Sequence, residues 1–229
     1  MIPVTLQPEP ADFDGEVRQP GLSAMQEQIG QPPTLKRRGP NIPQLVEPKT
    51  KKPITRIEDI PSDALKPYWR DCLGQLHTAY GGICAYVCTY IPLDTGSRTV
   101  EHFVPKSADR LQAYEWSNYR LACGLVNAKK GVIPDCIDPF EVMDDWFVMD
   151  LVGGQIKANP DLKDEALKRR IQDTIKKLGL SEYDDFCVAR RTWIREYLNE
   201  HITLDYLQRR APFVAREMER QGRLLAKDL

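Results

Sequence analysis

Apolar residues recur at helical spacing through the C-terminal third of the chain. Three segments show this period: residues 164–180, 184–202 and 211–226. Apolar positions three and four residues apart form one face of a helix, and that face packs against a core. The pattern therefore predicts a helical C-terminal region over residues 151–229.

A fourth helical pattern lies over residues 57–82. Ser62 or Asp63 is placed to cap its N-terminus, and the two glycines after Tyr80 are typical of a helix end. The residues that would share its apolar face are Leu65, Trp69, Cys72, Leu73 and Leu76.

Between these helical patterns the chain is rich in β-branched and aromatic residues. Residues 83–91 and 98–104 are typical of two strands joined by a turn that contains Pro, Asp and Gly. A short apolar element follows at residues 119–123, and we expect a helix to open near Asn127. Residues 138–161 predict two further short strands joined by a Gly-Gly turn. The expected fold class is therefore α+β and mostly helical.

Residues 1–50 lack a sustained apolar period and are rich in Pro, Gln and charged residues. A segment of this composition buries too little apolar surface to fold by itself. We therefore expect an extended Pro-rich arm over residues 1–50 that is partly disordered alone. A central domain over residues 51–150 and the helical region over residues 151–229 complete the predicted organisation.

The overall composition is typical of a soluble protein, and the net charge does not indicate a particular binding partner. The chain has 229 residues, of which 41% are hydrophobic and 28% charged, with a net charge of −1. These values are ordinary for a soluble protein, and no apolar run approaches the length of a membrane span. The N-terminus lacks the basic start and apolar core of a secretory signal. We therefore expect a cytoplasmic protein that does not contact a membrane.

One pair of polar residues stands at the end of the second predicted strand. Glu101 and His102 are adjacent there, and Pro105 follows them. Neighbouring residues on a strand point to opposite faces, so the pair can serve one site only where the strand ends or bends. Asn118 and Asn127 follow further along the chain. Carboxylate, imidazole and amide groups in this order suggest a site that activates water.

This order resembles the HNH, or ββα-metal, endonucleases. Their pattern is an acidic residue before a histidine, a middle asparagine and a last residue near the start of a short helix. The segments "EHFVPKS", "WSNYRLAC" and "NAKKG" carry the resemblance, within about residues 84–131. The chain matches the variant with His, Asn and Asn. The resemblance implies a small ββα-metal core within the α+β fold, and hydrolysis of phosphodiester bonds.

The residue types suit that chemistry. A neutral imidazole can take a proton from water near pH 7, which is the catalytic role expected of His102. Glu101 and the amide oxygen of Asn127 are hard oxygen ligands for Mg²⁺ or Mn²⁺. Asn118 is expected to hold the loop or to orient the imidazole. The basic residues expected to bind phosphate groups are Lys106, Arg120, Lys129 and Lys130.

The cysteines leave a structural zinc ion as an alternative. Many HNH proteins bind zinc through two CxxC pairs. Here Cys84 and Cys88 are separated by three residues, and Val126 stands where the partner of Cys123 would be. Tetrahedral zinc needs four ligands, so we expect apolar contacts in its place. The fourth ligand, if zinc is bound, would come from Cys136 or His77, and the apolar residues that would replace the ion are Ile83, Val87, Leu121 and Val126.

The size of the chain and its "EHF.PK" core also resemble the stand-alone HNH subunits of bacterial anti-phage systems of the Septu and retron-linked types. That resemblance implies an antiviral effector controlled by a partner ATPase. DNA is the favoured substrate. Two alternatives remain open: a ribonuclease that cuts tRNA or other RNA with the same site, and a non-catalytic module that binds nucleic acid or a partner protein.

Overall fold

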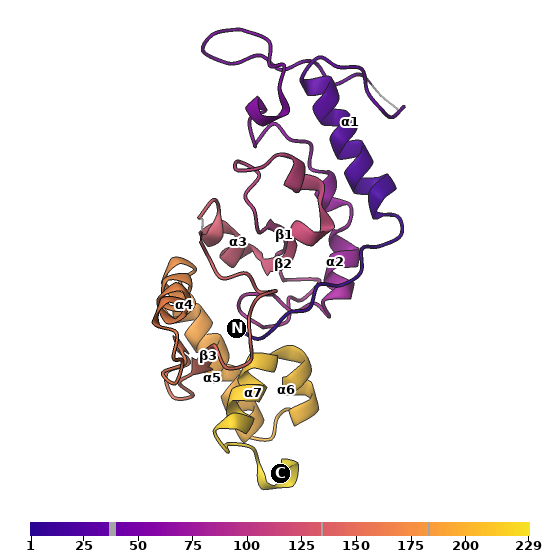
Figure 1. Cartoon of the computed structure of the whole chain (residues 1–229). Helices are drawn as coiled ribbons and strands as arrows, with labels where there is room; N and C mark the ends of the chain where they lie inside the picture. The colour runs from indigo at the N-terminus through magenta and orange to yellow at the C-terminus, as the bar shows by residue number, and fades with distance from the viewer. Residues whose placement is uncertain (37–39, 134, 183) are drawn as a thin grey trace. The chain divides into compact units, whose positions relative to one another are not determined.

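The computed structural model describes residues 1–36, 40–133, 135–182 and 184–229, and residues 37–39 of the predicted arm lie outside this range (Figure 1). Within the described residues the chain is α+β, with seven α-helices and two two-stranded sheets. The helices are α1 (Gln19–Gln28), α2 (Leu73–Ala79), α3 (Gly124–Lys130), α4 (Glu165–Lys177), α5 (Asp184–Leu198), α6 (Leu204–Arg210) and α7 (Pro212–Arg220). The strands are β1 (Arg98–His102), β2 (Tyr119–Cys123), β3 (Phe147–Met149) and β4 (Ile156–Ala158).

The chain divides into two compact units, each built from segments that are distant in sequence. The first unit comprises residues 1–6, 79–99 and 121–229. The second unit comprises residues 7–78 and 100–120. Among the helices described, none combines the length and the apolar character that a membrane span requires.

Strands β1 and β2 form one of the sheets, and α3 begins directly after β2. The N–H of Gly124 donates to the carbonyl of Ser97 (2.7 Å), and the N–H of Phe103 donates to the carbonyl of Asn118 (2.9 Å). The start of β1 therefore pairs with the end of β2, and the end of β1 pairs with the start of β2, so the two strands are antiparallel. Strand β1 ends at His102, as the sequence predicts.

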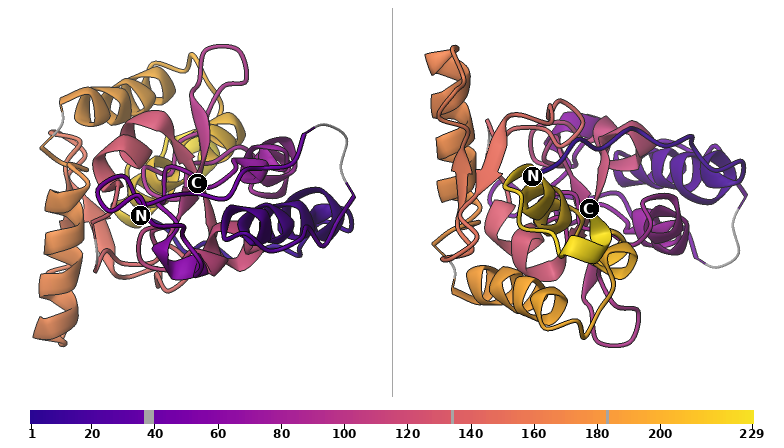
Figure 2. Two further views of the ribbon diagram at one scale, coloured as in Figure 1. Left: turned by 90° about the horizontal axis from the view of Figure 1, so that it is seen from above. Right: turned by 90° about the horizontal axis from the view of Figure 1, so that it is seen from below.

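The β3–β4 hairpin lies in the first unit, where Figure 2 shows α4 beside it. The register pairs Phe147 with Ala158 and Met149 with Ile156. Side chains cover both outer edges of this hairpin. At β3, the N–H of Met149 donates to the buried carboxylate of Glu217 on α7 (2.9 Å). Covering an edge in this way prevents pairing with another chain.

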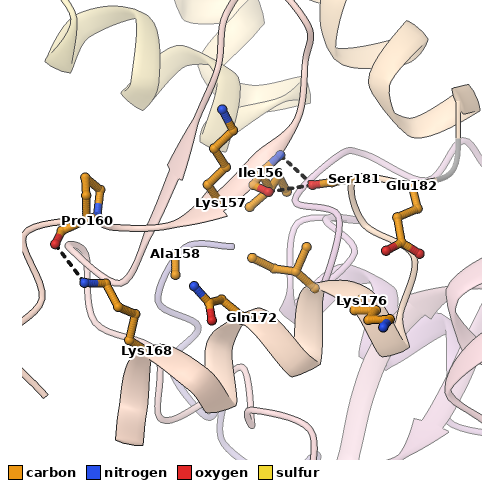
Figure 3. Close-up of a pocket in the computed structure, with 10 residues that line it drawn as sticks. Ile156, Lys157, Ala158, Pro160, Lys168, Gln172, Lys176, Ser181 and Glu182 are labelled. Carbon is orange, nitrogen blue, oxygen red and sulfur yellow. Dashed lines mark hydrogen bonds between the residues drawn. The ribbon is translucent and has the colours of Figure 1, made fainter. Parts of the chain in front are cut away.

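At β4, the hydroxyl of Ser181 covers the outer edge. It donates to the carbonyl of Ile156 (2.6 Å) and accepts from the N–H of the same residue (2.8 Å). A groove of about 420 Å³ continues from this point between β4 and α4 (Figure 3). Lysine side chains surround it, and the ammonium of Lys168 donates to the carbonyl of Pro160 (3.0 Å).

Ser181→Ala should lower the free energy of unfolding by about 1–3 kcal/mol, because it leaves two partly buried backbone groups of Ile156 without their partner. Urea unfolding followed by circular dichroism measures this change. Ser117→Ala is the matched control, since Ser117 is exposed and accepts from Arg120 through its backbone carbonyl, which the substitution preserves. Equal stability of the two variants would show that the hydroxyl does not support β4.

Helix α1 belongs to the second unit and packs closely against a tyrosine ring. A Cβ atom at Gly21 would lie 2.4 Å from the ring of Tyr114, so only glycine allows this approach. The hydroxyl of Tyr114 donates to the carbonyl of Lys66 (2.8 Å), and the amide of Gln28 donates to the carbonyl of Ala64 (2.6 Å). The predicted arm is therefore helical over α1 and not extended there.

Two predicted elements are wrong in the structure. Residues 83–91 form a turn with one isolated bridge and no strand, because Cys88 adopts a left-handed conformation (φ 55°) and its N–H donates to the carbonyl of Cys84 (2.9 Å). The helix predicted over residues 57–82 is reduced to α2. Pro61 and Pro67 lack the N–H that a helix interior needs. Short 3₁₀ turns therefore take the place of the first part of the predicted helix.

Candidate functional site

His102 is held by a hydrogen bond from one ring nitrogen. It is the last residue of β1 and is buried, with 7% of its surface exposed. Its Nε2 lies 3.1 Å from the carbonyl oxygen of Ala113. A carbonyl only accepts, so Nε2 carries the proton and donates. In the neutral ring the lone pair then belongs to Nδ1.

Aromatic rings fix the plane of this imidazole. Trp69 and Tyr119 each meet it edge-on, with centroid distances of 5.0 Å and 5.2 Å and interplanar angles of 90° and 80°. The hydroxyl of Tyr119 also donates to the carbonyl of Ala113 (2.7 Å). That carbonyl therefore accepts from both side chains, and the three groups hold one another in place.

Asn118 uses its whole amide group to hold the loop between β1 and β2. Its Oδ1 accepts from the N–H of Val104 (2.7 Å), and its Nδ2 donates to the carbonyls of Val104 (3.1 Å) and Gln112 (2.9 Å). Gln112 precedes Ala113, whose carbonyl holds His102. Asn118 therefore positions the imidazole indirectly through the loop, and it is a positioning residue.

Glu101 and Lys106 lie in the same unit as His102. Glu101 is 1% exposed. The ammonium of Lys106 lies 4.1 Å from the centroid of the Trp69 ring, the same ring that packs against His102. Burial, and then the charge of Arg70, lower the pKa of Lys106. Lys106 and His102 therefore contact the same aromatic ring.

Arg120 is oriented towards the backbone. It is buried, and its Nη1 donates to the carbonyls of Ser117 (2.7 Å) and Tyr119 (3.0 Å). Its guanidinium also lies 5.1 Å from the ring of Phe103. In this conformation Arg120 stabilises the start of β2, and its predicted contact with phosphate stays a prediction.

Three predicted site residues belong to α3 in the first unit. Asn127 and Lys129 are half-buried, and Lys130 is 1% exposed. The helix opens three residues before Asn127, at Gly124, so it starts near the position that the sequence predicts. The second unit thus carries Glu101, His102, Asn118, Lys106 and Arg120, and the first unit carries the residues of α3.

The cysteines named as possible zinc ligands also belong to the first unit. The N–H of Cys123 donates to the sulfur of Cys84 (3.4 Å). A hydrogen bond with Cys84 lowers the pKa of the Cys123 thiol, whereas burial raises the pKa of the Cys84 thiol well above its usual range. Over the described part of the chain, no three His, Cys, Asp or Glu residues are grouped to hold a metal ion.

The sequence gives no signal for two important contributors to this site. Ala113 acts through its backbone carbonyl, so its side-chain type carries no information. Trp69 packs on His102 from a segment more than thirty residues earlier in the chain. Tyr119 could have been found from its position next to Asn118 in an alternating run. Comparison with protein-family models matches no family, and no curated protein shows significant similarity to this chain.

Proposed function

We propose that the chain is a metal-dependent HNH endonuclease that hydrolyses phosphodiester bonds in nucleic acid, with DNA the favoured substrate. His102 is the general base, and Glu101 holds a divalent cation, for which the sequence also predicts Asn127 as a ligand. Asn118 positions the loop, and Lys106 is the phosphate contact with the clearest structural support.

The observation that carries this proposal is the hydrogen bond from Nε2 of His102 to the carbonyl of Ala113 (3.1 Å). It fixes the tautomer and turns Nδ1 into the basic atom. Two edge-on aromatic rings restrict the ring further. A general base must be oriented before the substrate arrives, and this arrangement provides that orientation.

In the proposed reaction Nδ1 of His102 takes a proton from a water molecule as the water oxygen attacks phosphorus. The bond from phosphorus to the leaving 3′-oxygen breaks, and that oxygen acquires a proton from solvent. The ammonium of Lys106, held over the Trp69 ring, offsets negative charge on the phosphate. The two side chains used in these steps, His102 and Lys106, both belong to the second unit.

The ligand types assigned to the cation fit a hard metal ion. Glu101 offers carboxylate oxygens and Asn127 an amide oxygen, which Mg²⁺ and Mn²⁺ prefer over nitrogen or sulfur. When bound there, the ion would stabilise the charge that develops on the phosphate and the leaving oxygen. A small number of protein ligands leaves room for the water molecules that Mg²⁺ retains.

Purified protein should cut supercoiled plasmid in the presence of Mg²⁺ or Mn²⁺ and should stop when EDTA removes the metal. Agarose gels resolve nicked and linear products. Parallel incubation with total tRNA distinguishes a deoxyribonuclease from a ribonuclease, because the proposed chemistry does not require the 2′-hydroxyl. Cutting that continues in EDTA would refute the metal-dependent mechanism, and no cutting of either polymer would favour a binding module.

A further inference from the structure

A cavity of about 200 Å³ lies within the first unit, between the loop of residues 87–97 and α5. Apolar side chains form much of its wall, among them Val87, Ile91 and Phe186. Thr89 and Ser97 add hydroxyl groups, and Arg190 of α5 brings a guanidinium to the lining. The cavity is thus mostly apolar, with one cationic group and a few hydrogen-bonding groups.

Arg190 is almost fully buried, with 2% of its surface exposed, as are Lys130 and Arg120. Its Nη1 donates to the carbonyls of Gly154 (3.0 Å) and Leu180 (2.6 Å). Its Nη2 is buried as well, and no described residue accepts a hydrogen bond from it. Nη1 of the guanidinium is therefore fixed by two backbone carbonyls, whereas the N–H groups of Nη2 have no acceptor among the described residues.

No carboxylate compensates the charge of Arg190 within the described residues. Burial lowers its pKa to about 10, and the groups that favour its charged form are the thiols of Cys187 and Cys88, of which Cys187 also forms a hydrogen bond with the guanidinium. A thiol is a weak acceptor and is neutral when protonated, so it does not replace a counter-charge. The guanidinium remains charged near neutral pH. A buried cation without a counter-charge is costly, and an anion would remove that cost.

We propose that this cavity binds a small organic anion, whose carboxylate or phosphate group pairs with the guanidinium of Arg190 and whose apolar part packs against Val87, Ile91 and Phe186. The volume limits the ligand, since sites for larger organic molecules span about 300–1,000 Å³. A single ring with one acidic group is a suitable size. This site is independent of the nuclease activity proposed for His102.

The cavity lies next to the residues where β1 and α3 begin. Ser97 precedes β1 directly, and Cys123 is the N-cap of α3; both line the cavity. The N–H of Gly124 donates to the carbonyl of Ser97 (2.7 Å), which ties these two wall segments together. A bound anion would therefore contact the chain where β1 and α3 begin.

The test is a titration of the purified full chain with phenyl phosphate, benzoate and the neutral analogue benzyl alcohol, each at constant ionic strength. Thermal unfolding and isothermal calorimetry report binding. At ten times its Kd, a bound anion should raise Tm by about 3–6 °C. A response to phenyl phosphate alone identifies a phosphate ligand, a response to benzoate alone identifies a carboxylate, and either result supports the proposal.

Ala189→Phe fills the cavity from its rim and leaves the hydrogen bonds of Arg190 untouched, so it should abolish the response without unfolding the protein. Arg191→Met is the matched control, because Arg191 is adjacent, donates to the carbonyl of Gly153 (2.8 Å) and does not line the cavity. It should respond as the unmodified chain does. Absence of saturable binding by both anions, an equal response to benzyl alcohol, or an unchanged response in Ala189→Phe would overturn the proposal.

Discussion

His102→Ala should reduce the rate of metal-dependent cleavage by about 10²–10⁴-fold. The substitution removes the only group assigned to take the proton from water, and solvent replaces it poorly. Initial rates of plasmid nicking, measured at saturating Mg²⁺, give the ratio. Binding of an uncleaved oligonucleotide should change little, because the phosphate contacts are assigned to other residues.

His201→Ala is the control for this loss. His201 is exposed, and its Nδ1 lies 2.9 Å from the carboxylate of Glu196, far along the chain from the candidate site. Its removal should leave the nicking rate within about twofold, since surface substitutions of this kind change stability little. A rate for His102→Ala close to that of His201→Ala would mean that His102 is not the base.

Asn118→Ala is expected to destabilise the protein by about 2–4 kcal/mol, because it leaves a buried N–H and two carbonyls of the loop without their partners. Urea unfolding measures the difference. The loop also carries the carbonyl that holds His102, so cleavage by the folded fraction should fall as well. Asn118→Asp should not restore stability, because a carboxylate oxygen would face the carbonyls of Val104 and Gln112.

Ser117→Ala tests whether the effect is specific to the Asn118 amide. Ser117 is exposed and adjacent, and its backbone carbonyl accepts from Arg120, an interaction that the substitution preserves. Its stability should lie within about 0.5 kcal/mol of the unmodified chain. If Asn118→Ala were no less stable than Ser117→Ala, Asn118 would not hold the loop.

Elements with a strong local pattern could be predicted from the sequence. Helices α4, α5 and α7 lie within the segments that show helical spacing, and the β3–β4 hairpin follows from two short apolar runs around Gly153 and Gly154. The end of β1 at His102 was also predictable, since a polar pair and a proline follow the apolar run. In each case a few neighbouring residues determine the structure.

Elements that depend on tertiary contacts could not be predicted in this way. Helix α1 contains Pro20 and Gly21, which usually indicate a loop, but proline is tolerated in the first helical turn and the glycine allows contact with Tyr114. Residues 83–91 have the composition of a strand, yet a left-handed Cys88 turns the chain instead. Helix α6 is short and depends on its cap, where the hydroxyl of Thr203 accepts from the N–H of Tyr206 (3.1 Å).

The candidate site also combines residues that the sequence predicts with a contact that depends on the tertiary structure. Glu101, His102 and Asn118 could be chosen by residue type and order, because carboxylate, imidazole and amide groups carry the proposed chemistry. The carbonyl of Ala113 could not be chosen, since any residue provides one and only the fold of the loop brings it to His102. The tautomer of the imidazole is therefore information that the structure adds.

The role of His102 as the base depends on which ring nitrogen carries the proton. Nitrogen-15 NMR of the imidazole groups measures this directly, and the spectrum of His102→Ala assigns the signal among the three histidines of the chain. At a pH where the ring is neutral, we expect the proton on Nε2 and an unprotonated Nδ1. A neutral ring with its proton on Nδ1 would contradict the hydrogen bond to Ala113 and the proposed mechanism with it.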